Sequence, residues 1–451
     1  MKWKTVELGE VLTLKRGYDL PKRMRKEGLV PIISSAGISG YHNEAKAAPP
    51  GVVIGRYGTI GNVFFTDDDY WPLNTSLYVK DFKGNDPKYI SFLLETINYY
   101  EYSDKAAVPG VNRNHLHKAL VTIPENIDDQ RAIAAKIAVL DDKIALNRRT
   151  NATLEALAQA LFRAWFVDYE PVRAKLAAKR LSRDPERVAM AAIGGKLRVP
   201  RDAEARLTVE DLDTALAELD QLTEVQQAEL ARTAGLFPGA LVDSELGEVP
   251  AGWVVRCIGD VVDVSDYVAN GSFKSLKENV NFLDSGGYAF YLRTTDFKNG
   301  YNKEKRFVDE ESYNFLSKTK LFGREVIISN VGDVGTVFRP PSWLGFRMTL
   351  GSNAVSLVGT GISNEYLFKY FNSERGQHLL KSITTGSAQL KFNKTNLRSS
   401  NIIMPTSALM GESDKHFNAT NELINNILAT NVKLSELRDN LLPELLNQKN
   451  E

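Results

Sequence analysis

A long internal repeat is the feature that most constrains how this chain can fold. The run GVVIGRYGTIGNVFF, Gly51 to Phe65, returns in weaker form as GREVIISNVGDVGTVF, Gly323 to Phe338, and Gly332 follows Gly58 by 274 residues (332 − 58). Solenoids and propellers need at least three short stacked units, so a large unit that occurs only twice excludes both. The repeat predicts two similar globular domains in one chain.

A second repeated segment lies downstream of the first. VNRNHLHKALVTIP, Val111 to Pro124, is echoed by FNKTNLRSSNIIMP, Phe392 to Pro405, where Asn112 corresponds to Asn393. A long helical pattern follows each copy. Each predicted domain is therefore followed by its own helix.

The first helical pattern, from Asp128 to Phe166, has the 4,3 alternation of a coiled-coil seam. At about 1.5 Å per residue, this helix is expected to be on the order of 60 Å long. The second pattern, from about Asp414 to Asn447, repeats part of the seam. The predicted seam positions are Ile133, Ile137, Leu140, Ile144, Asn147, Asn151, Leu154, Ala158, Leu161 and Trp165 in the first helix, and Ile424, Ile427, Asn431, Leu434, Leu437 and Leu441 in the second.

Two copies of one helix, each following its own domain, are expected to pair antiparallel about an approximate twofold axis. The centre of the first helix lies near residues 147 to 151, close to that axis. Asn431 follows Asn151 by 280 residues (431 − 151). Buried asparagines fix the register of coiled coils. We therefore expect Asn151 to meet Asn431 and to set the helix register.

The expected fold class is α+β, with two domains of mixed strands and helices separated by two long antiparallel coiled-coil helices in a pseudo-twofold arrangement. Short β-branched or aromatic segments bounded by turn residues predict strands at 30–35, 51–54, 62–65 and 75–80, and apolar periodicity predicts helices at 87–99 and 364–372. Extra material is expected in the second domain, around 286–317. The predicted boundaries are 1–125 and 241–406 for the domains, 126–170 and 407–451 for the long helices, and 171–240 for a charged insertion.

This insertion belongs to neither copy of the repeat. Its first part, VRAKLAAKRLSRDPERVAM, is basic, while DAEARLTVEDLDTALAELDQLTEVQQAEL is acidic and amphipathic. The simpler interpretation is a helical insertion that packs on itself through these opposite charges. The alternative is a docking surface for a partner subunit.

Composition narrows the class of protein. The chain has 451 residues, 43% of them hydrophobic, which is enough for two to four domains with proper cores. The single cysteine, Cys257, excludes a disulfide framework, and no window approaches the roughly 18 to 20 consecutive apolar residues of a membrane span, so we expect a cytoplasmic protein. Lys and Arg together number 56, as do Asp and Glu. This balance permits the local basic patches that a site-specific nucleic-acid binder needs.

Motifs for catalysis are missing from the sequence. It contains no G-x-x-x-x-G-K-[ST] phosphate loop, and the glycines at 55–61 lie between short strands, where a dinucleotide site needs a helix. The Pro-Pro pairs at 49–50 and 340–341 lack the neighbours that hold a flipped adenine in amino-methyltransferases. His115 and His117 have no nearby carboxylate or thiol to complete a metal site. We therefore expect no catalytic residue, no metal and no cofactor in this chain.

Candidate binding residues gather at two turns in each repeat. In GRYGTIG, a basic, an aromatic and a hydroxyl side chain stand between glycines that let the backbone approach a ligand closely. Arg reads guanine edges and Asn adenine edges, while Lys and Thr contact phosphates. A glycine-rich hairpin with solvated tips is the alternative for each turn alone, but both turns recur with different side chains, as expected of two domains that read different sequences. The candidate DNA-binding residues are Arg56, Tyr57, Thr59, Asn74, Lys105, Asn112, Arg113, Asn114, Arg293, Asn330, Arg347, Lys391, Asn393 and Lys394.

The long helical run carries a resemblance to a known family. DDQRAIAAKIAVLDDKIALNRRTNATLEALAQALFRAWF follows the first domain, and VDSELGEVPAGW opens the second. With two variable domains, these motifs make the chain resemble the specificity subunit of type I restriction-modification systems over nearly its whole length. The insertion, from about Val172 to Gly235, is the departure, because it is longer and more helical than the resemblance implies.

The resemblance implies a noncatalytic subunit whose target-recognition domains, 1–125 and 241–406, each read one half of an asymmetric, interrupted site in double-stranded DNA. It further implies that the helices act as a ruler, that two methyltransferase subunits dock on them and methylate adenine, and that restriction subunits supply ATP-driven translocation and cleavage.

Two other functions stay open from the sequence. One is the specificity subunit of a standalone DNA methyltransferase. The other is a coiled-coil scaffold whose globular ends bind proteins or sugars. The scaffold predicts no strong salt dependence of DNA binding, whereas phosphate contacts demand a steep one.

Overall fold

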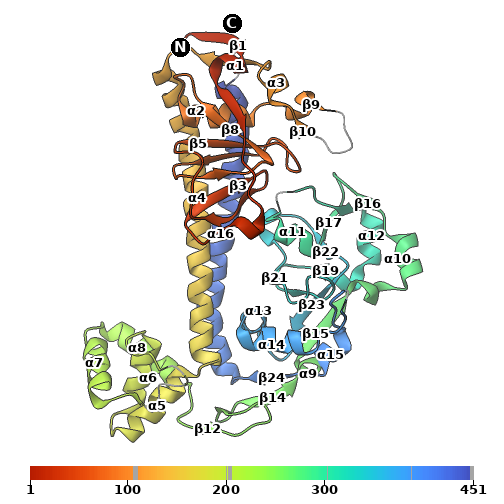
Figure 1. Cartoon of the computed structure of the whole chain (residues 1–451). Coiled ribbons are helices and arrows are strands. Elements are labelled where there is room, and N and C mark those ends of the chain that lie inside the picture. Colours follow the sequence, from red (N-terminus) through yellow and green to blue (C-terminus); the bar gives the residue numbers. More distant parts are fainter. Residues whose placement is uncertain (105–109, 200, 202–205, 302, 388, 447–451) are drawn as a thin grey trace. The chain divides into compact units, whose positions relative to one another are not determined.

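The chain forms two compact units, Met1–Arg148 with Thr430–Glu451, and Arg149–Ala429 (Figure 1). Two 40-residue helices, α4 (Ile127–Phe166) and α16 (Ser407–Leu446), each contribute one stretch to each unit. The fold is mixed α/β with two sheet-rich parts and two long helices, as the sequence predicts. The structure, a computed structural model, describes residues 1–104, 110–199, 201, 206–301, 303–387 and 389–446.

A four-stranded antiparallel sheet, in the order β2-β8-β5-β6, lies in the core of the first unit. Its inner strand β5 is buried along its whole length because its sequence, GVVIG, is apolar on both faces. Helix α2 packs on this sheet and begins at Asp86, whose side chain accepts a hydrogen bond from the Tyr89 backbone N–H. The elements before α4 are β1 Trp3–Glu7, α1 Leu8–Val11, β2 Thr13–Arg16, η1 Lys22–Met24, β3 Val30–Ser34, β4 Gly37–His42, β5 Gly51–Gly55, β6 Val63–Thr66, β7 Trp71–Pro72, β8 Ser76–Asp81, α2 Pro87–Glu95, η2 Tyr99–Tyr102, β9 Ser103–Asp104, β10 Gly110–Val111, α3 Arg113–Leu116 and β11 Leu120–Pro124.

The second unit repeats this topology. Its sheet β15-β23-β20-β21 has the antiparallel order of β2-β8-β5-β6, and β14 pairs with β24 as β1 pairs with β11, which confirms the internal repeat. A five-stranded sheet, β16-β18-β17-β22-β19, takes the place of the three-stranded sheet β4-β3-β7. The elements between the insertion and α16 are β12 Leu241–Val242, β13 Val249–Pro250, β14 Val254–Cys257, α9 Ile258–Val261, β15 Val262–Asp266, η4 Tyr267–Asn270, α10 Phe273–Asn279, β16 Phe282–Leu283, β17 Ala289–Leu292, α11 Thr294–Lys298, β18 Phe307–Val308, α12 Glu310–Phe315, η5 Ser317–Thr319, β19 Lys320–Leu321, β20 Val326–Ser329, β21 Val337–Phe338, η6 Ser342–Leu344, β22 Met348–Leu350, β23 Ala354–Gly359, α13 Asn364–Phe371, α14 Glu374–Ser382, α15 Lys394–Arg398 and β24 Asn401–Met404.

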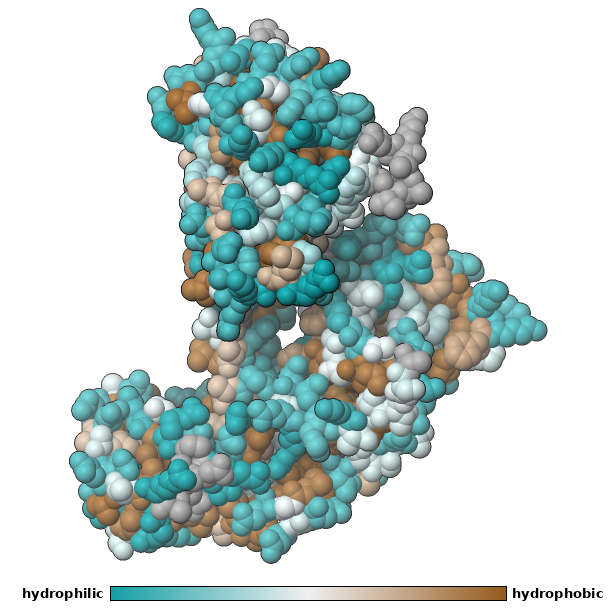
Figure 2. All heavy atoms as spheres, in the orientation of Figure 1, coloured by the Kyte–Doolittle hydropathy of each residue, from teal (hydrophilic) through white to brown (hydrophobic). Residues whose placement is uncertain are grey.

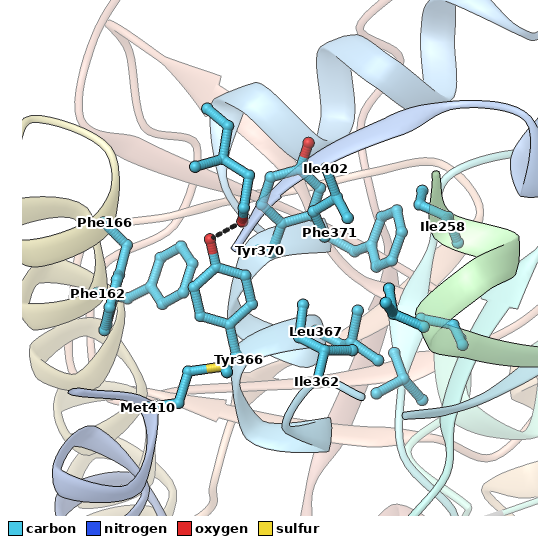
Figure 3. Close-up of a cluster of buried hydrophobic side chains, with 14 of the residues drawn as sticks. Phe162, Phe166, Ile258, Ile362, Tyr366, Leu367, Tyr370, Phe371, Ile402 and Met410 are labelled. Carbon is cyan, nitrogen blue, oxygen red and sulfur yellow. Dashed lines mark hydrogen bonds between the residues drawn. The ribbon is translucent and has the colours of Figure 1, made fainter. Parts of the chain in front are cut away.

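Each unit has a core that includes stretches of both long helices. In the first unit, Ile133 of α4 and Leu442 of α16 pack in one cluster with the residues of the sheet. In the second unit, the ring of Phe162 from α4 lies 5.2 Å from that of Tyr366 on α13 (Figure 3). The Tyr366 hydroxyl donates a hydrogen bond of 2.8 Å to the carbonyl oxygen of Ile403, so this buried aromatic residue has its polar atom satisfied. Apolar contacts therefore attach each sheet-rich part to the helices of its own unit.

The visible surface is largely hydrophilic, with apolar residues scattered over it (Figure 2). Scattered apolar residues are normal on the surface of a folded protein. Among the described residues, no helix is both long and apolar enough to cross a membrane.

The seam predicted for α4 is confirmed, since each predicted position is buried or half-buried. The seam predicted for α16 holds at Ile424, Ile427, Asn431, Leu434 and Leu441, which are buried or half-buried, but is wrong at Leu437, which is 48% exposed. Arg438 faces α4 instead, and its Nη1 donates to Oδ1 of Asp141 at 3.1 Å. A helix of 3.6 residues per turn drifts from a strict seven-residue repeat, so the contacting face moves by one residue over this length.

Contacts across the helices also establish that they are antiparallel. In the first unit Asp141 pairs with Arg438, and Asn147 pairs with Asn431. The partner number on α16 thus falls as the residue number on α4 rises.

The predicted partner of Asn431 is wrong by one helical turn. Nδ2 of Asn147, not of Asn151, donates to Oδ1 of Asn431 at 2.7 Å, and both side chains of this pair are buried. Asn151 donates to the carbonyl oxygen of Ile424 at 3.4 Å, and its own Oδ1 is buried without a partner among the described residues. The repeat spacing places the asparagines in the seam, but the axial offset of the helices is set by the cores on which they pack.

We expect the variant Asn147→Leu to lower the free energy of unfolding by about 1–3 kcal/mol, because it leaves the Asn431 amide buried without its partner. In the double variant Asn147→Leu/Asn431→Leu, both polar groups are replaced, so the loss should largely disappear. Urea unfolding of the full chain measures both effects. A double variant that loses as much stability as the two single variants together would contradict this account of the pair.

In the described part of the insertion there are four α-helices, α5 (Glu170–Arg180), α6 (Pro185–Ile193), α7 (Val209–Asp220) and α8 (Glu224–Ala234). They enclose small apolar clusters of their own. The guanidinium group of Arg183 donates to both carboxylate oxygens of Asp213 on α7, at 2.6 and 2.8 Å. Lys196 pairs with Glu218 of the same helix at 3.6 Å. These contacts support the simpler interpretation, in which the insertion packs on itself through opposite charges.

Candidate functional site

The first glycine turn, residues 55–61, connects β5 and β6. The Gly61 N–H donates to the Gly55 carbonyl oxygen at 3.0 Å, and the Gly55 N–H donates to Asn62 at 2.8 Å, so the loop closes on itself. Gly58 and Gly61 have φ angles of 75° and 80°, which favour glycine. A Cβ atom on Gly55 would lie 1.9 Å from the carbonyl oxygen of Thr59. Glycine at these positions is therefore required by the backbone of the turn.

The glycine turn is joined to the second predicted turn. The Val111 N–H donates to the Arg56 carbonyl oxygen at 3.1 Å, and Tyr57 forms a β-bridge with Gly110. The absence of a side chain at Gly110 leaves room for the Tyr57 ring, since a Cβ there would lie 2.2 Å from it. The Arg56 guanidinium stacks on the same ring, 4.5 Å from its centroid, and Nε donates to the Val111 carbonyl oxygen at 3.3 Å. We call this arrangement the first paired turns, residues 55–61 with 110–114.

Helix α3 presents the polar residues that follow the second turn. Asn112 caps it, and its side-chain oxygen accepts from the Asn114 N–H at 3.0 Å. Arg113 and Asn114 are exposed. His117 caps the C-terminus of α3, and its Nε2 accepts a hydrogen bond of 3.0 Å from the Leu14 N–H. Burial, together with the nearby Arg113 and Lys83 charges, lowers the pKa of His117, so the neutral ring that this hydrogen bond requires is favoured.

Three other candidates of the first unit have different surroundings. Thr59 is exposed at the tip of the glycine turn. Asn74 lies beside the turn, because the carbonyl oxygen of the next residue, Thr75, accepts a hydrogen bond of 3.0 Å from the Arg56 N–H. The side-chain amide of Asn74, however, donates to Asp19. Lys105 lies outside the described residues.

The second unit contains the same pairing of turns. The Gly335 N–H donates to the Ser329 carbonyl oxygen at 3.0 Å, as Gly61 donates to Gly55. The Phe392 N–H donates to the Asn330 carbonyl oxygen at 3.1 Å, and Val331 forms a β-bridge with Lys391. These are the second paired turns, residues 329–335 with 391–394. The backbone of the site is thus repeated, while a tyrosine at its bridge is replaced by a valine.

Side chains of the second paired turns are only partly available to a ligand. Lys391 and Asn393 are exposed, although Asn393 also caps α15 by accepting from the Asn396 N–H at 2.7 Å. Lys394 is held by Asp266 at 2.9 Å. The Asn330 amide donates weakly to Phe392 at 3.4 Å, and its Oδ1 is buried without a partner among the described residues.

Arg293 and Arg347 lie beside the five-stranded sheet rather than in the paired turns, since Arg293 directly follows β17 and Arg347 directly precedes β22. Arg293 forms a bidentate pair with Asp296, with distances of 3.0 and 2.6 Å, and this hydrogen bonding raises the pKa of the arginine. Arg347 is exposed and stacks on the Tyr288 ring, 4.7 Å from its centroid. Of the two, Arg347 is the better placed to contact a ligand.

One group of cations was missed by the sequence reasoning above. Lys22, Arg23, Arg25 and Lys26 lie within five residues, at and just after η1, and three of them are exposed. The signal that could have found them is the run KRMRK itself. Charge density alone, without a repeat or a motif, marks this segment.

Comparison with known proteins follows the same division of the chain. The family described as the type I restriction modification DNA specificity domain matches residues 1–156 and 250–430. The unmatched range between them contains helices α5 to α8 of the insertion.

Relatives of known type cover different shares of the chain. This chain is 29% identical over 419 residues to the type I restriction enzyme HindI specificity subunit of Haemophilus influenzae, and the aligned part covers 87% of this chain and 83% of that protein. It is 25% identical over 140 residues to the EcoprrI specificity subunit of Escherichia coli, covering 30% of this chain and 35% of that one. Among solved structures, the type I restriction-modification S subunit from M. genitalium matches with a TM-score of 0.48 and 14% identity, covering 100% of this chain and 97% of that chain.

Proposed function

Because this chain belongs to the type I restriction-modification DNA specificity family, we propose that its two sheet-rich parts are target-recognition domains that each read one half of an asymmetric, interrupted DNA site. The chain is a specificity subunit, the noncatalytic component that binds DNA within the type I complex. The first paired turns would read one half-site, and the second paired turns the other.

The observation that carries this proposal is the repeated backbone of the paired turns. The hydrogen bonds from Val111 to Arg56 and from Phe392 to Asn330 have the same length, 3.1 Å, and each joins a glycine turn to the segment that precedes a short helix. The side chains on this shared backbone differ. Arg and Lys can read guanine and Asn can read adenine, so different side chains on one scaffold suit two different half-sites.

The long helices supply the spacing in this proposal. A 40-residue helix is about 60 Å long, and ten base pairs of B-DNA span about 34 Å, so the helix pair is long enough to hold two domains on successive turns of one duplex. Methyltransferase subunits, two of them, would dock on the helices and methylate adenine. Restriction subunits would join them for ATP-dependent cleavage, in the cytoplasm.

We expect Arg113→Ala and Lys391→Ala each to weaken recognition of one half-site only. Loss of a base contact costs about 1–3 kcal/mol, which is roughly a 5- to 150-fold loss of affinity for the cognate duplex. Both side chains are exposed, so neither variant should unfold the chain. The measurement is binding of the full chain to duplexes in which the base pairs of each half-site are changed one at a time.

A matched control is Lys4→Ala, which removes an exposed cation from β1 in the first unit. It should leave base preference in both half-sites unchanged. If Arg113→Ala and Lys391→Ala both keep the wild-type affinity and base preference, the paired turns are not the reading surface.

A further inference from the structure

The charge of the segment Lys22, Arg23, Arg25 and Lys26, which we call the basic turn, is not compensated by its surroundings. Among the described residues, none of these four side chains forms an ion pair. Of the two acids nearest in sequence, Asp19 accepts from the Asn74 amide, and Glu27 is exposed. Like charges held this close repel one another, and a polyanion relieves that repulsion.

Two hydrogen bonds anchor the basic turn to the β3–β4 hairpin. Nη1 of Arg25 donates to the Ser39 carbonyl oxygen at 2.7 Å and passes over Gly40, where a Cβ atom would lie only 3.1 Å from it. The Lys26 N–H donates to Nδ1 of the buried His42 at 3.0 Å. His42 in turn packs against Trp71 of the same sheet, with ring centroids 5.2 Å apart. These contacts anchor the Arg25 side chain and the backbone at Lys26, while the side chains of Lys22, Arg23 and Lys26 are exposed to a ligand.

The same hairpin leads to the first paired turns. The β3–β4 turn contains Ser35, whose carbonyl oxygen would lie 3.1 Å from a Cβ on Gly55. Ser39, whose carbonyl oxygen accepts the hydrogen bond from Arg25, follows Ser35 by four residues. At about 3.3 Å per residue, the basic turn contacts the hairpin within roughly 13 Å of the glycine turn. Measured along the helix axis, that distance covers about four phosphates of one strand, at roughly 3.4 Å of axis each.

The corresponding segment of the second unit, residues 267–288, carries fewer cations. Between β15 and β17, in the position that corresponds to the basic turn, the cations are Lys274 and Lys277. Lys274 lies 4.0 Å from Glu278, and Asp284 follows in the same segment. The two units therefore differ in charge where their sheet topology is alike.

We propose that the basic turn is a phosphate-binding element of the first domain, which adds sequence-independent affinity for duplex DNA and no base preference. This proposal rests on the proposed DNA-reading function and assigns base recognition and phosphate binding to different residues of the first domain. The first paired turns select bases, while Lys22, Arg23 and Lys26 contact the sugar-phosphate backbone beside them. The first domain thereby carries more of the salt dependence of binding than the second.

The test compares the full chain with Lys22→Ala/Arg23→Ala and with the charge-matched control Lys2→Ala/Lys4→Ala, which removes two exposed cations from the start of the same unit. Fluorescence anisotropy gives the affinity for cognate and scrambled duplexes between about 50 and 200 mM salt. When binding uses phosphate contacts, the logarithm of the affinity falls linearly with the logarithm of the salt concentration. Each lost contact should reduce the slope of log affinity against log salt by about 0.9, so the test variant should lose close to two units. Its affinity should fall by the same factor for both duplexes, and its methylated site should be unchanged.

Four results would overturn the proposal. An unchanged salt slope in Lys22→Ala/Arg23→Ala, or an equal loss of slope in the control, would remove the basic turn as a phosphate contact while leaving half-site reading intact. A changed base preference would assign these residues to base reading instead. If the wild-type chain shows no preference for any duplex, the proposed function itself fails, and this inference fails with it.

Discussion

Replacing Phe162 by alanine is expected to lower the free energy of unfolding by about 3–5 kcal/mol. The Phe162 ring is fully buried and lies where α4, α13 and α16 meet, 5.1 Å from Phe166, 5.2 Å from Tyr366 and 6.3 Å from Phe417 (Figure 3). Its removal takes away the transfer energy of the ring and leaves a cavity that aromatic neighbours cannot easily fill. Urea or thermal unfolding of the full chain measures the loss.

Leu157→Ala is the matched control on the same helix. Leu157 is 62% exposed, so its truncation should change the free energy of unfolding by about 0.5 kcal/mol or less. Equal losses for the two variants would mean that the Phe162 cluster does not hold the sheet-rich part of the second unit on α4.

Insertion of seven residues after Arg148 in α4, together with seven after Ala429 in α16, is expected to abolish recognition of the natural site. Seven residues preserve the phase of the seam and lengthen each helix by about 10 Å, which is roughly three base pairs. Half-sites at the natural spacing could then no longer be contacted together, and affinity should fall by a factor of about 10³ or more, towards nonspecific binding. Sequencing of methylated adenines in DNA from cells carrying the variant complex gives the new spacing.

The complex that contains the lengthened protein should methylate sites whose spacer is longer by about three base pairs. Because three base pairs also rotate a half-site by roughly a third of a turn, the recovered affinity should be partial. The same seven residues placed after Gln221, between α7 and α8, are the control and should leave the spacer unchanged. An unaltered spacer in the long-helix variant would exclude the helices as a ruler.

Local sequence pattern was enough to predict much of this fold. The 4,3 alternation located α4 to within a residue at its start and at its end, and short β-branched runs located β3, β5, β6 and β8. Helix α16, however, begins at Ser407, seven residues before its helical sequence pattern starts at about Asp414, and α2 ends at Glu95, four residues before the predicted end. Helix ends depend on caps and packing as well as on periodicity, so they are the least predictable part of an element.

The candidate site was predictable in its backbone and less so in its side chains. The glycine spacing and its recurrence located both pairs of turns. Nothing in the sequence indicated that Asn112 and Asn393 cap short helices, or that Lys394 is paired with Asp266, 128 residues away (394 − 266). Such ion pairs join segments distant in sequence, and they form only when the sheet brings those segments together.

By itself, the sequence determined that this chain has two related domains and two seam-forming helices, because a repeat and a periodicity can be read without knowing any long-range contact. Only the tertiary structure decided that Asn431 pairs with Asn147 rather than with Asn151. It also decided that each glycine turn is bonded to a segment more than fifty residues downstream. The physical reason is the same in both cases: axial offset and turn pairing depend on how cores pack, and packing is a property of the folded chain.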